Sequence, residues 1–163
     1  MKVSPKIILD WPVLQKQVEL ARQAGKKIAF TNGCFDLIHY GHVRYLQAAK
    51  KTKRILVVGL NSDASVRRNK GQERPIVKQM QRAEVLAALQ CVDWVTLFAE
   101  DTPQRLVEVL QPDVLVKGAD WRGKPVAGSD VVRARKGRVE FIRYVPGSST
   151  TLLIKKILKT CRD

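Results

Sequence analysis

Acidic residues, aromatic residues and histidines are all scarce in this chain of 163 residues. Only 15 Asp and Glu stand against 30 Lys and Arg, and the resulting net charge of +15 predicts attraction to nucleic acid, membrane surfaces or phosphorylated small molecules. Aromatic residues make up 6% and do not interleave with the basic runs, so the sequence lacks the stacking platforms typical of single-strand binders. Both histidines lie in one stretch of four residues, from His39 to His42.

Long apolar runs and paired cysteines are missing as well. No segment approaches the roughly 20 continuous apolar residues of a membrane span, and residues 1–5 contain no apolar signal region. We therefore expect a cytoplasmic protein with no membrane partner. Cys34, Cys91 and Cys161 are widely spaced and form no CxxC pair, which favours reduced thiols over disulfides or a zinc site.

Apolar runs alternate with helical patterns from end to end. Strands are predicted over 27–31, 54–60, 92–98, 114–116 and 139–144, and helices over 12–24, 42–50, 79–89, 129–136 and 151–160, with shorter helices opening at 61–63 and at 101–103, where Thr102 is the expected cap. This alternation predicts an α/β fold: a Rossmann-like, doubly wound, mostly parallel sheet with helices on both faces. We expect one domain over 1–163, with 1–25 as an N-terminal helical extension.

Ligands of such sheets bind at the carboxyl ends of the strands, so the loop after the first strand is the first candidate site. Residues 31–42 (TNGCFDLIHYGH) fill it, and His39 and His42 flank Gly41 where a helix begins. A helix N-terminus binds phosphate through free N–H groups, and imidazole N–H groups add donors for transition-state charge. This context favours phosphate binding over two locally bonded histidines. A metal site that adds Cys34 lacks a fourth ligand, and a Cys34 nucleophile lacks any other neighbouring cation.

A second phosphate-binding segment is predicted at the start of the last helix. The segment Gly147–Thr151 (GSSTT) places hydroxyl groups and free amides at a helix N-terminus. An ordinary Ser or Thr cap is the simpler interpretation, but four consecutive hydroxyl residues exceed what capping needs.

The segment Lys117–Trp121 (KGADW) follows another buried strand. Asp120 can accept hydrogen bonds from ribose or base donors, and Trp121 can either shield a base or pack in the core. The run 118–124 nearly matches a Walker A loop, but Pro125 stands where the magnesium-binding hydroxyl is required, so we reject a P-loop.

A basic stretch follows the strand at 54–60. Lys70 and Arg74 are the best candidates there for holding a phosphosugar, whereas Arg67 and Arg68 are expected to be solvated. Asp36, in the first loop, could orient the sugar or help to hold magnesium, or it could be a turn residue that bonds its own backbone.

These segments together resemble one superfamily. TNGCFDLIHYGHVRYLQAAK is similar to the first motif of the cytidylyltransferase-like (HxGH) nucleotidyltransferases, and more closely to that of the stand-alone bacterial D-glycero-β-D-manno-heptose 1-phosphate adenylyltransferases. The similarity continues through NSDASVRRNKGQERPI, RAEVLAALQCVDWVTLFAEDTPQRL, PDVLVKGADW and SSTTLLIKKI, which covers nearly the whole chain from Lys27. Related cytidylyltransferases carry RTEGISTT near the last helix. Here Arg143 is one position out of register, so no arginine role is transferred to it.

The resemblance implies an activity and a set of site residues. It implies that ATP and D-glycero-β-D-manno-heptose 1-phosphate give ADP-heptose, a lipopolysaccharide precursor, and pyrophosphate, with Mg²⁺ held mainly through the phosphates and with no protein metal ligands. The expected catalytic residues are His39, His42 and Lys70; the expected nucleotide-binding residues are Thr31, Asn32, Gly33, Phe35, Gly41, Lys117, Gly118, Asp120, Ser149, Thr150 and Thr151; the expected sugar-binding residues are Asp36 and Arg74. The resemblance also implies a homodimer.

Two alternatives differ from this prediction. Residues 120–124 (DWRGK) also resemble enzymes that join CTP to glycerol 3-phosphate, although the NSDAS, VDW and LVKGAD segments favour the heptose branch. A basic, non-catalytic nucleic-acid-binding module would explain the charge. It would leave HYGH and GSSTT without a purpose, so nucleic acid is not the expected partner.

Overall fold

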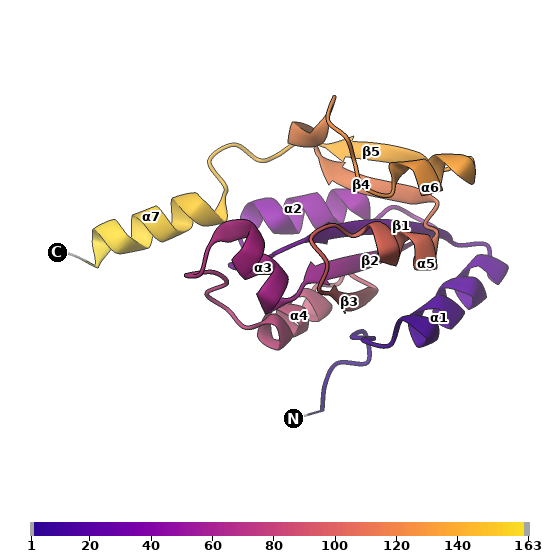
Figure 1. Ribbon diagram of the computed structural model, residues 1–163, viewed down its shortest axis with the longest axis horizontal. Helices are drawn as coiled ribbons and strands as arrows, with labels where there is room; N and C mark the ends of the chain where they lie inside the picture. The colour runs from indigo at the N-terminus through magenta and orange to yellow at the C-terminus, as the bar shows by residue number, and fades with distance from the viewer. Residues whose placement is uncertain (1, 162–163) are drawn as a thin grey trace.

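The computed structural model, which describes residues 2–161, contains one sheet of five parallel strands (Figure 1). The strands are β1 (Lys27–Gly33), β2 (Arg54–Asn61), β3 (Trp94–Phe98), β4 (Val114–Gly118) and β5 (Arg138–Ile142), in the order β3-β2-β1-β4-β5. The chain order reverses direction between β1 and β4, so the crevice outside their carboxyl ends is the expected ligand site.

Helices cover both faces of the sheet (Figure 1). They are α1 (Trp11–Gln23), α2 (Tyr40–Ala49), α3 (Asp63–Lys70), α4 (Gln79–Ala88), α5 (Gln104–Leu110), α6 (Ser129–Ala134) and α7 (Thr150–Thr160), with a 3₁₀ turn η1 (Ala119–Trp121) after β4. One core cluster joins α2 and α4 to the sheet, and a second joins α1, α5 and α6 to it. The predicted fold class is therefore confirmed.

The side-chain alternation of β1 explains why it lies between two cores. Ala29 enters the α2/α4 core, whereas Ile28 and Phe30 enter the other, because successive side chains of a strand point to opposite faces. Leu14 and Val18 of α1 are fully buried in the second core. The predicted extension over 1–25 thus contributes side chains to the core. Residue 1 and residues 162–163 lie outside the part of the chain that the structure describes.

Several predicted boundaries are corrected by local hydrogen bonds. The helix predicted from His42 begins at Tyr40, because His39 occupies the N-cap position. Thr102 was the wrong cap: Pro103 is the N-cap residue of α5, and no side chain caps that end. The strand predicted from residue 92 begins at Trp94. Just before it, the carboxylate of Asp93 accepts the backbone N–H of Leu56 at 2.6 Å.

Candidate active site

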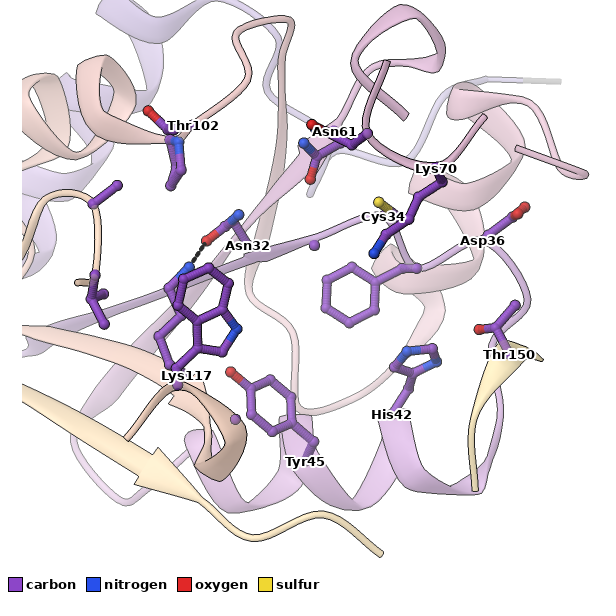
Figure 2. A pocket seen from close by; sticks show the side chains of 18 of the residues that line it. Asn32, Cys34, Asp36, His42, Tyr45, Asn61, Lys70, Thr102, Lys117 and Thr150 are labelled. Carbon is purple, nitrogen blue, oxygen red and sulfur yellow. Dashed lines mark hydrogen bonds between the residues drawn. The ribbon is translucent and has the colours of Figure 1, made fainter. Parts of the chain in front are cut away.

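The carboxyl ends of the strands open into a cavity of about 1030 Å³ (Figure 2). It is lined by fourteen of the sixteen residues that the sequence predicts for the site, namely Asn32, Gly33, Phe35, Asp36, His39, Gly41, His42, Lys70, Arg74, Lys117, Gly118, Ser149, Thr150 and Thr151. Among residues 2–161, Thr31 and Asp120 are the two predicted residues outside this lining. Thr31 is fully buried, and its hydroxyl lies 2.8 Å from that of Tyr45.

The N-terminus of α2 forms one wall of the cavity. Nδ1 of His39 accepts the backbone N–H of His42 at 3.4 Å and so caps the helix. Because Nδ1 accepts, the proton of the neutral His39 ring belongs on Nε2. The two imidazole rings stack with centroids 3.8 Å apart, and the Phe35 ring lies 5.1 Å from that of His42. Figure 2 shows His42 at the cavity, at the start of α2.

Both histidines are poor bases in this setting. Burial, followed by the neighbouring His39, lowers the pKa of His42 from 6.5 to about 4. Burial also lowers the pKa of His39. Nδ1 of His42 is buried without a hydrogen-bond partner in the described part of the chain. At neutral pH both rings are therefore uncharged hydrogen-bond donors, a form that can bind phosphate oxygens without a strong proton affinity.

The start of α7 lies beside the N-terminus of α2 and lines the same cavity (Figure 2). Ser149 is its N-cap, and its hydroxyl accepts the amide of Leu152 at 3.1 Å. The preceding loop comes so close to α2 that a Cβ added to Gly41 would lie 2.9 Å from Cβ of Ser148. Two helix N-termini thus face one cavity, and both present free N–H groups and the positive ends of their dipoles.

Lys117 and Trp121 lie on the β4 side of the cavity. Nζ of Lys117 donates to Oδ1 of Asn32 at 2.5 Å and lies 5.1 Å from the centre of the Trp121 ring. Burial lowers the pKa of Lys117 to about 8, although the negative charge of Asp120 opposes the shift. Trp121 is 39% exposed and lines the cavity, so it does not pack in the core.

Tyr144 takes the place where related cytidylyltransferases carry their arginine. Its ring packs on Gly118, where an added Cβ would lie 2.1 Å from the Tyr144 hydroxyl oxygen. Burial and a hydrogen bond with Asp120 raise the pKa of Tyr144 to about 12. Asp120 therefore faces Tyr144, whereas Arg143 is exposed and outside the cavity lining of residues 2–161.

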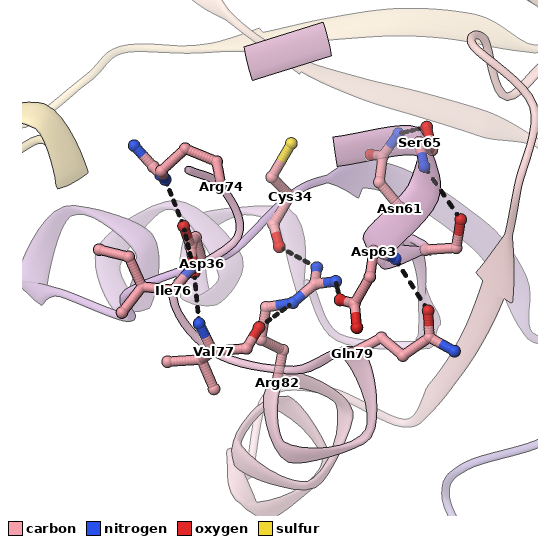
Figure 3. A network of polar contacts seen from close by, with 11 residues as sticks. Cys34, Asp36, Asn61, Asp63, Ser65, Arg74, Ile76, Val77, Gln79 and Arg82 are labelled. Atoms are coloured by element: carbon pink, nitrogen blue, oxygen red, sulfur yellow. Dashed lines mark hydrogen bonds and ion pairs between the residues drawn. The ribbon is translucent and has the colours of Figure 1, made fainter. Parts of the chain in front are cut away.

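A polar network connects the first loop to the basic segment (Figure 3). The Asp36 carboxylate, whose side chain is 1% exposed, accepts the amides of Ile76 and Val77 at 2.8 and 3.0 Å and Nε of Arg74 at 2.5 Å. Arg82 of α4 is fully buried; it donates to the Cys34 carbonyl and to the Asp63 carboxylate at 2.5 and 2.7 Å.

This network changes how Asp36 and Arg74 are interpreted. The carboxylate that the sequence offered as a sugar or magnesium ligand is occupied by the backbone at 76–77 and by Arg74. Arg74 still lines the cavity, but its Nε is engaged by Asp36. Lys70 lines the cavity without such a bond in the described part of the chain, and it is exposed.

Sequence reasoning missed three residues that shape this site. Asn61 ends β2 and lines the cavity, and its position after a buried strand was a usable signal. Arg82 lies within an amphipathic helix pattern that gives no hint of its burial. Tyr144 is the last residue of the strand predicted over 139–144, two residues past the observed end of β5, and it departs from the motif of the relatives, which was a signal of altered local contacts.

Among residues 2–161, no group of three or more His, Cys, Asp or Glu side chains converges in a way that could hold a metal ion. No helix in the same range is long and apolar enough to cross a membrane.

A parallel sheet whose switch point opens between two helix N-termini, one of them carrying HYGH, defines a nucleotide-handling α/β enzyme. The profile of the cytidylyltransferase-like family matches residues 30–156. The chain belongs to this family, and it is a nucleotidyltransferase. The family predicted from the sequence motifs is thus confirmed, and a non-catalytic nucleic-acid-binding module is excluded as the class of the chain.

Curated relatives match this chain over most of its length. The chain is 53% identical over 159 residues to the "Bifunctional protein HldE" of Citrifermentans bemidjiense. The matched residues cover 98% of this chain and 33% of that protein. It is 57% identical over 142 residues to the HldE of Geobacter metallireducens, over 87% of this chain and 29% of that protein. The chain therefore spans about a third of the length of these curated relatives.

A solved structure shows the same fold. It is that of the lipopolysaccharide core biosynthesis protein from Thermoplasma volcanium, with a TM-score of 0.59 and 28% identity. The match covers 73% of this chain and 96% of that one. The similarity therefore extends over most of the parallel α/β unit.

Proposed function

We propose that this nucleotidyltransferase joins ATP and D-glycero-β-D-manno-heptose 1-phosphate to give ADP-heptose and pyrophosphate. The observation that carries the proposal is the cavity lined by the N-termini of both α2 and α7, with the two neutral histidines at the first and Ser149 at the second. The names of the HldE relatives and of the lipopolysaccharide protein support a sugar-nucleotide product. We also propose a homodimer, as the resemblance implies, and a cytoplasmic location.

The proposed reaction needs no protein nucleophile. An oxygen of the sugar phosphate attacks the α-phosphorus of ATP in line, the new P–O bond forms, and the bond to the pyrophosphate oxygen breaks. His39 and His42 donate hydrogen bonds to phosphate oxygens as negative charge shifts towards the leaving group. The amides of Ser149, Thr150 and Thr151 and the hydroxyls of Ser149 and Thr151 hold the triphosphate from the α7 side, whereas the Thr150 hydroxyl donates to the Leu37 carbonyl at 3.4 Å.

The nucleoside and the acceptor then occupy different strand ends. Lys117, Gly118 and Trp121 after β4 suit the nucleoside side, where the indole can cover a base. Lys70 and Arg74 supply positive charge for the phosphate of the acceptor. Asn32 is held by Lys117 at the boundary between the two sides.

Mg²⁺ is the cofactor in this proposal. The cavity is lined by Asp36, Asp101 and Asp130, but Asp36 is bonded to Arg74 and to backbone amides, and Asp101 accepts Nε of Arg68. This donor set fits an ion held chiefly by phosphate oxygens and water. When bound, it would neutralise phosphate charge, while the side chains named above position the reacting groups.

Transfer of CMP to glycerol 3-phosphate is the second candidate within the class, because residues 120–124 also resemble that branch. Pyrophosphate release separates the two: ATP, CTP and GTP are each assayed with heptose 1-phosphate and with glycerol 3-phosphate. We expect release only with ATP and the heptose phosphate, and loss of release in His42→Ala. Release with CTP and glycerol 3-phosphate alone would replace the proposed substrates.

A further inference from the structure

The β2 side of the cavity contains two amides that the proposed reaction does not use. Asn61 is the last residue of β2 and is 5% exposed, and Asn69 lies in the last turn of α3. Both line the cavity, as do the cations Lys70 and Arg74. An amide beside cations can bind the uncharged part of a phosphorylated molecule, provided that its orientation is fixed.

Ser65 fixes the orientation of Asn61. Its fully buried hydroxyl donates to the carbonyl oxygen of Glu100 at 3.0 Å. A carbonyl oxygen can only accept, so the single proton of this hydroxyl is committed and its oxygen can only accept in turn. Nδ2 of Asn61 lies 2.9 Å from that oxygen and must be the donor, which turns the nitrogen of the amide towards Ser65 (Figure 3).

Asn69 approaches the same hydroxyl. Its Nδ2 lies 3.5 Å from Oγ of Ser65, at the limit of a hydrogen bond. The hydrogen bonds found for these two side chains among residues 2–161 thus use the nitrogen atoms and leave the carbonyl oxygens as acceptors. Carbonyl oxygens repel phosphate and accept hydrogen bonds from hydroxyl groups.

We propose that Asn61 and Asn69, oriented by Ser65, form a subsite that binds the hydroxyl groups of the acceptor. This inference rests on the proposed function: it divides the acceptor site into a cationic part, Lys70 and Arg74, for the phosphate and an amide part for the polyol. The amide part makes the enzyme select a hydroxylated sugar phosphate over a simple alkyl phosphate. Ser65 is a positioning residue, because it acts through Asn61.

The test compares three kinetic constants in Asn61→Ala and in the matched control Gln47→Ala. They are KM for heptose 1-phosphate, KM for ATP, and the inhibition constant of ethyl phosphate, which has no hydroxyl group. Gln47 is an exposed amide on α2 and lies outside the cavity lining of residues 2–161. In Asn61→Ala we expect KM for heptose 1-phosphate to rise about tenfold and the other two constants to change less than about twofold.

Two results would overturn the subsite: an unchanged KM for heptose 1-phosphate in folded Asn61→Ala, or an equal change in all three constants, which would make Asn61 merely structural.

Ser65→Ala provides a second variant if Asn61→Ala does not fold. Its KM for heptose 1-phosphate should rise by a smaller factor, and its inhibition constant for ethyl phosphate should not change. An unchanged KM for heptose 1-phosphate in Ser65→Ala would contradict the proposal. Calorimetric binding of heptose 1-phosphate and ethyl phosphate makes the same comparison without turnover. An inactive wild-type protein that binds heptose 1-phosphate through Asn61 would thus refute the reaction and retain the subsite.

Discussion

Nε of Arg74 lies 2.5 Å from Oδ2 of Asp36, and this pair joins the loop after β1 to the basic segment after α3. The same carboxylate accepts the amides of Ile76 and Val77, so one buried side chain determines where the chain carrying Arg74 runs. The cation proposed to bind the acceptor phosphate is therefore positioned by a residue next to the HYGH segment.

Asp36→Asn is expected to reduce the free energy of unfolding by about 1–3 kcal/mol at pH 7, because Arg74 and the two amides lose a charged acceptor. Burial alone would raise the pKa of Asp36, but the bonds from Val77, Ile76 and Arg74 outweigh it and hold the pKa below its ordinary 3.8. The stabilisation is thus present above about pH 3.8 and is lost as the pH falls through the lower pKa of the folded protein.

Urea unfolding of both proteins between pH 3 and pH 8 measures this difference. The gap between wild type and Asp36→Asn should be constant from about pH 5 upward and narrow in acid. Asp101→Asn is the control, since Asp101 forms an exposed pair with Arg68 and should change stability by less than about 0.5 kcal/mol. A gap that does not depend on pH would show that the charge of Asp36 contributes nothing.

The lowered pKa of Lys117 predicts that nucleotide binding weakens at alkaline pH. Its pKa of about 8 means that the free enzyme loses this cation as the pH rises through 8. If Lys117 contributes to nucleotide binding as a cation, kcat/KM for ATP should fall above about pH 8, by up to roughly tenfold. In Lys117→Met, kcat/KM for ATP should be low at every pH and should show no further fall above about pH 8. An equal alkaline fall in the variant would assign the step to another group.

Gly118→Ala tests the contact with Tyr144. The backbone there has φ −66°, which alanine adopts without strain, but the new Cβ would lie 2.1 Å from the Tyr144 hydroxyl oxygen. Tyr144 is 55% exposed and can move, so we expect little loss of stability and a KM for ATP raised about tenfold. The double variant Gly118→Ala/Tyr144→Ala should match Tyr144→Ala alone, because the contacts with the Tyr144 ring are gone and the remaining one, with Oδ1 of the exposed Asp120 at 2.7 Å, is relieved by rotation of that side chain. Fully additive effects would mean that the two positions do not interact.

His42→Ala is expected to lower kcat by about 10²–10³-fold while the protein stays folded, because a donor to the transition-state phosphates is lost. Tyr40→Phe is the matched control: Tyr40 lies between the two histidines, at the first position of the same helix, and is 63% exposed. Circular dichroism checks the fold, and pyrophosphate release measures kcat. Near-normal turnover in folded His42→Ala would remove the histidine from the mechanism.

The sequence predicted the sheet well because each buried strand reads as a continuous apolar run, as β2 and β4 do. It also predicted that HYGH and GSSTT each lie where a helix begins, and residues of both segments line the cavity. It could not predict that Asp36 faces Arg74 and the backbone at 76–77, because that depends on a contact across about forty residues of chain. The burial of Arg82 was hidden for the same reason: its partners, at Cys34 and Asp63, come from two other segments.

Paired radiolabels test nucleotidyl transfer most directly. The protein is incubated with heptose 1-phosphate, Mg²⁺ and ATP labelled with ³²P at either the α- or the γ-phosphorus. Attack at the α-phosphorus predicts that the α-label enters the sugar nucleotide and the γ-label enters pyrophosphate. A γ-label in the sugar product or in orthophosphate, or no transfer of the α-label to any sugar phosphate, would contradict the account.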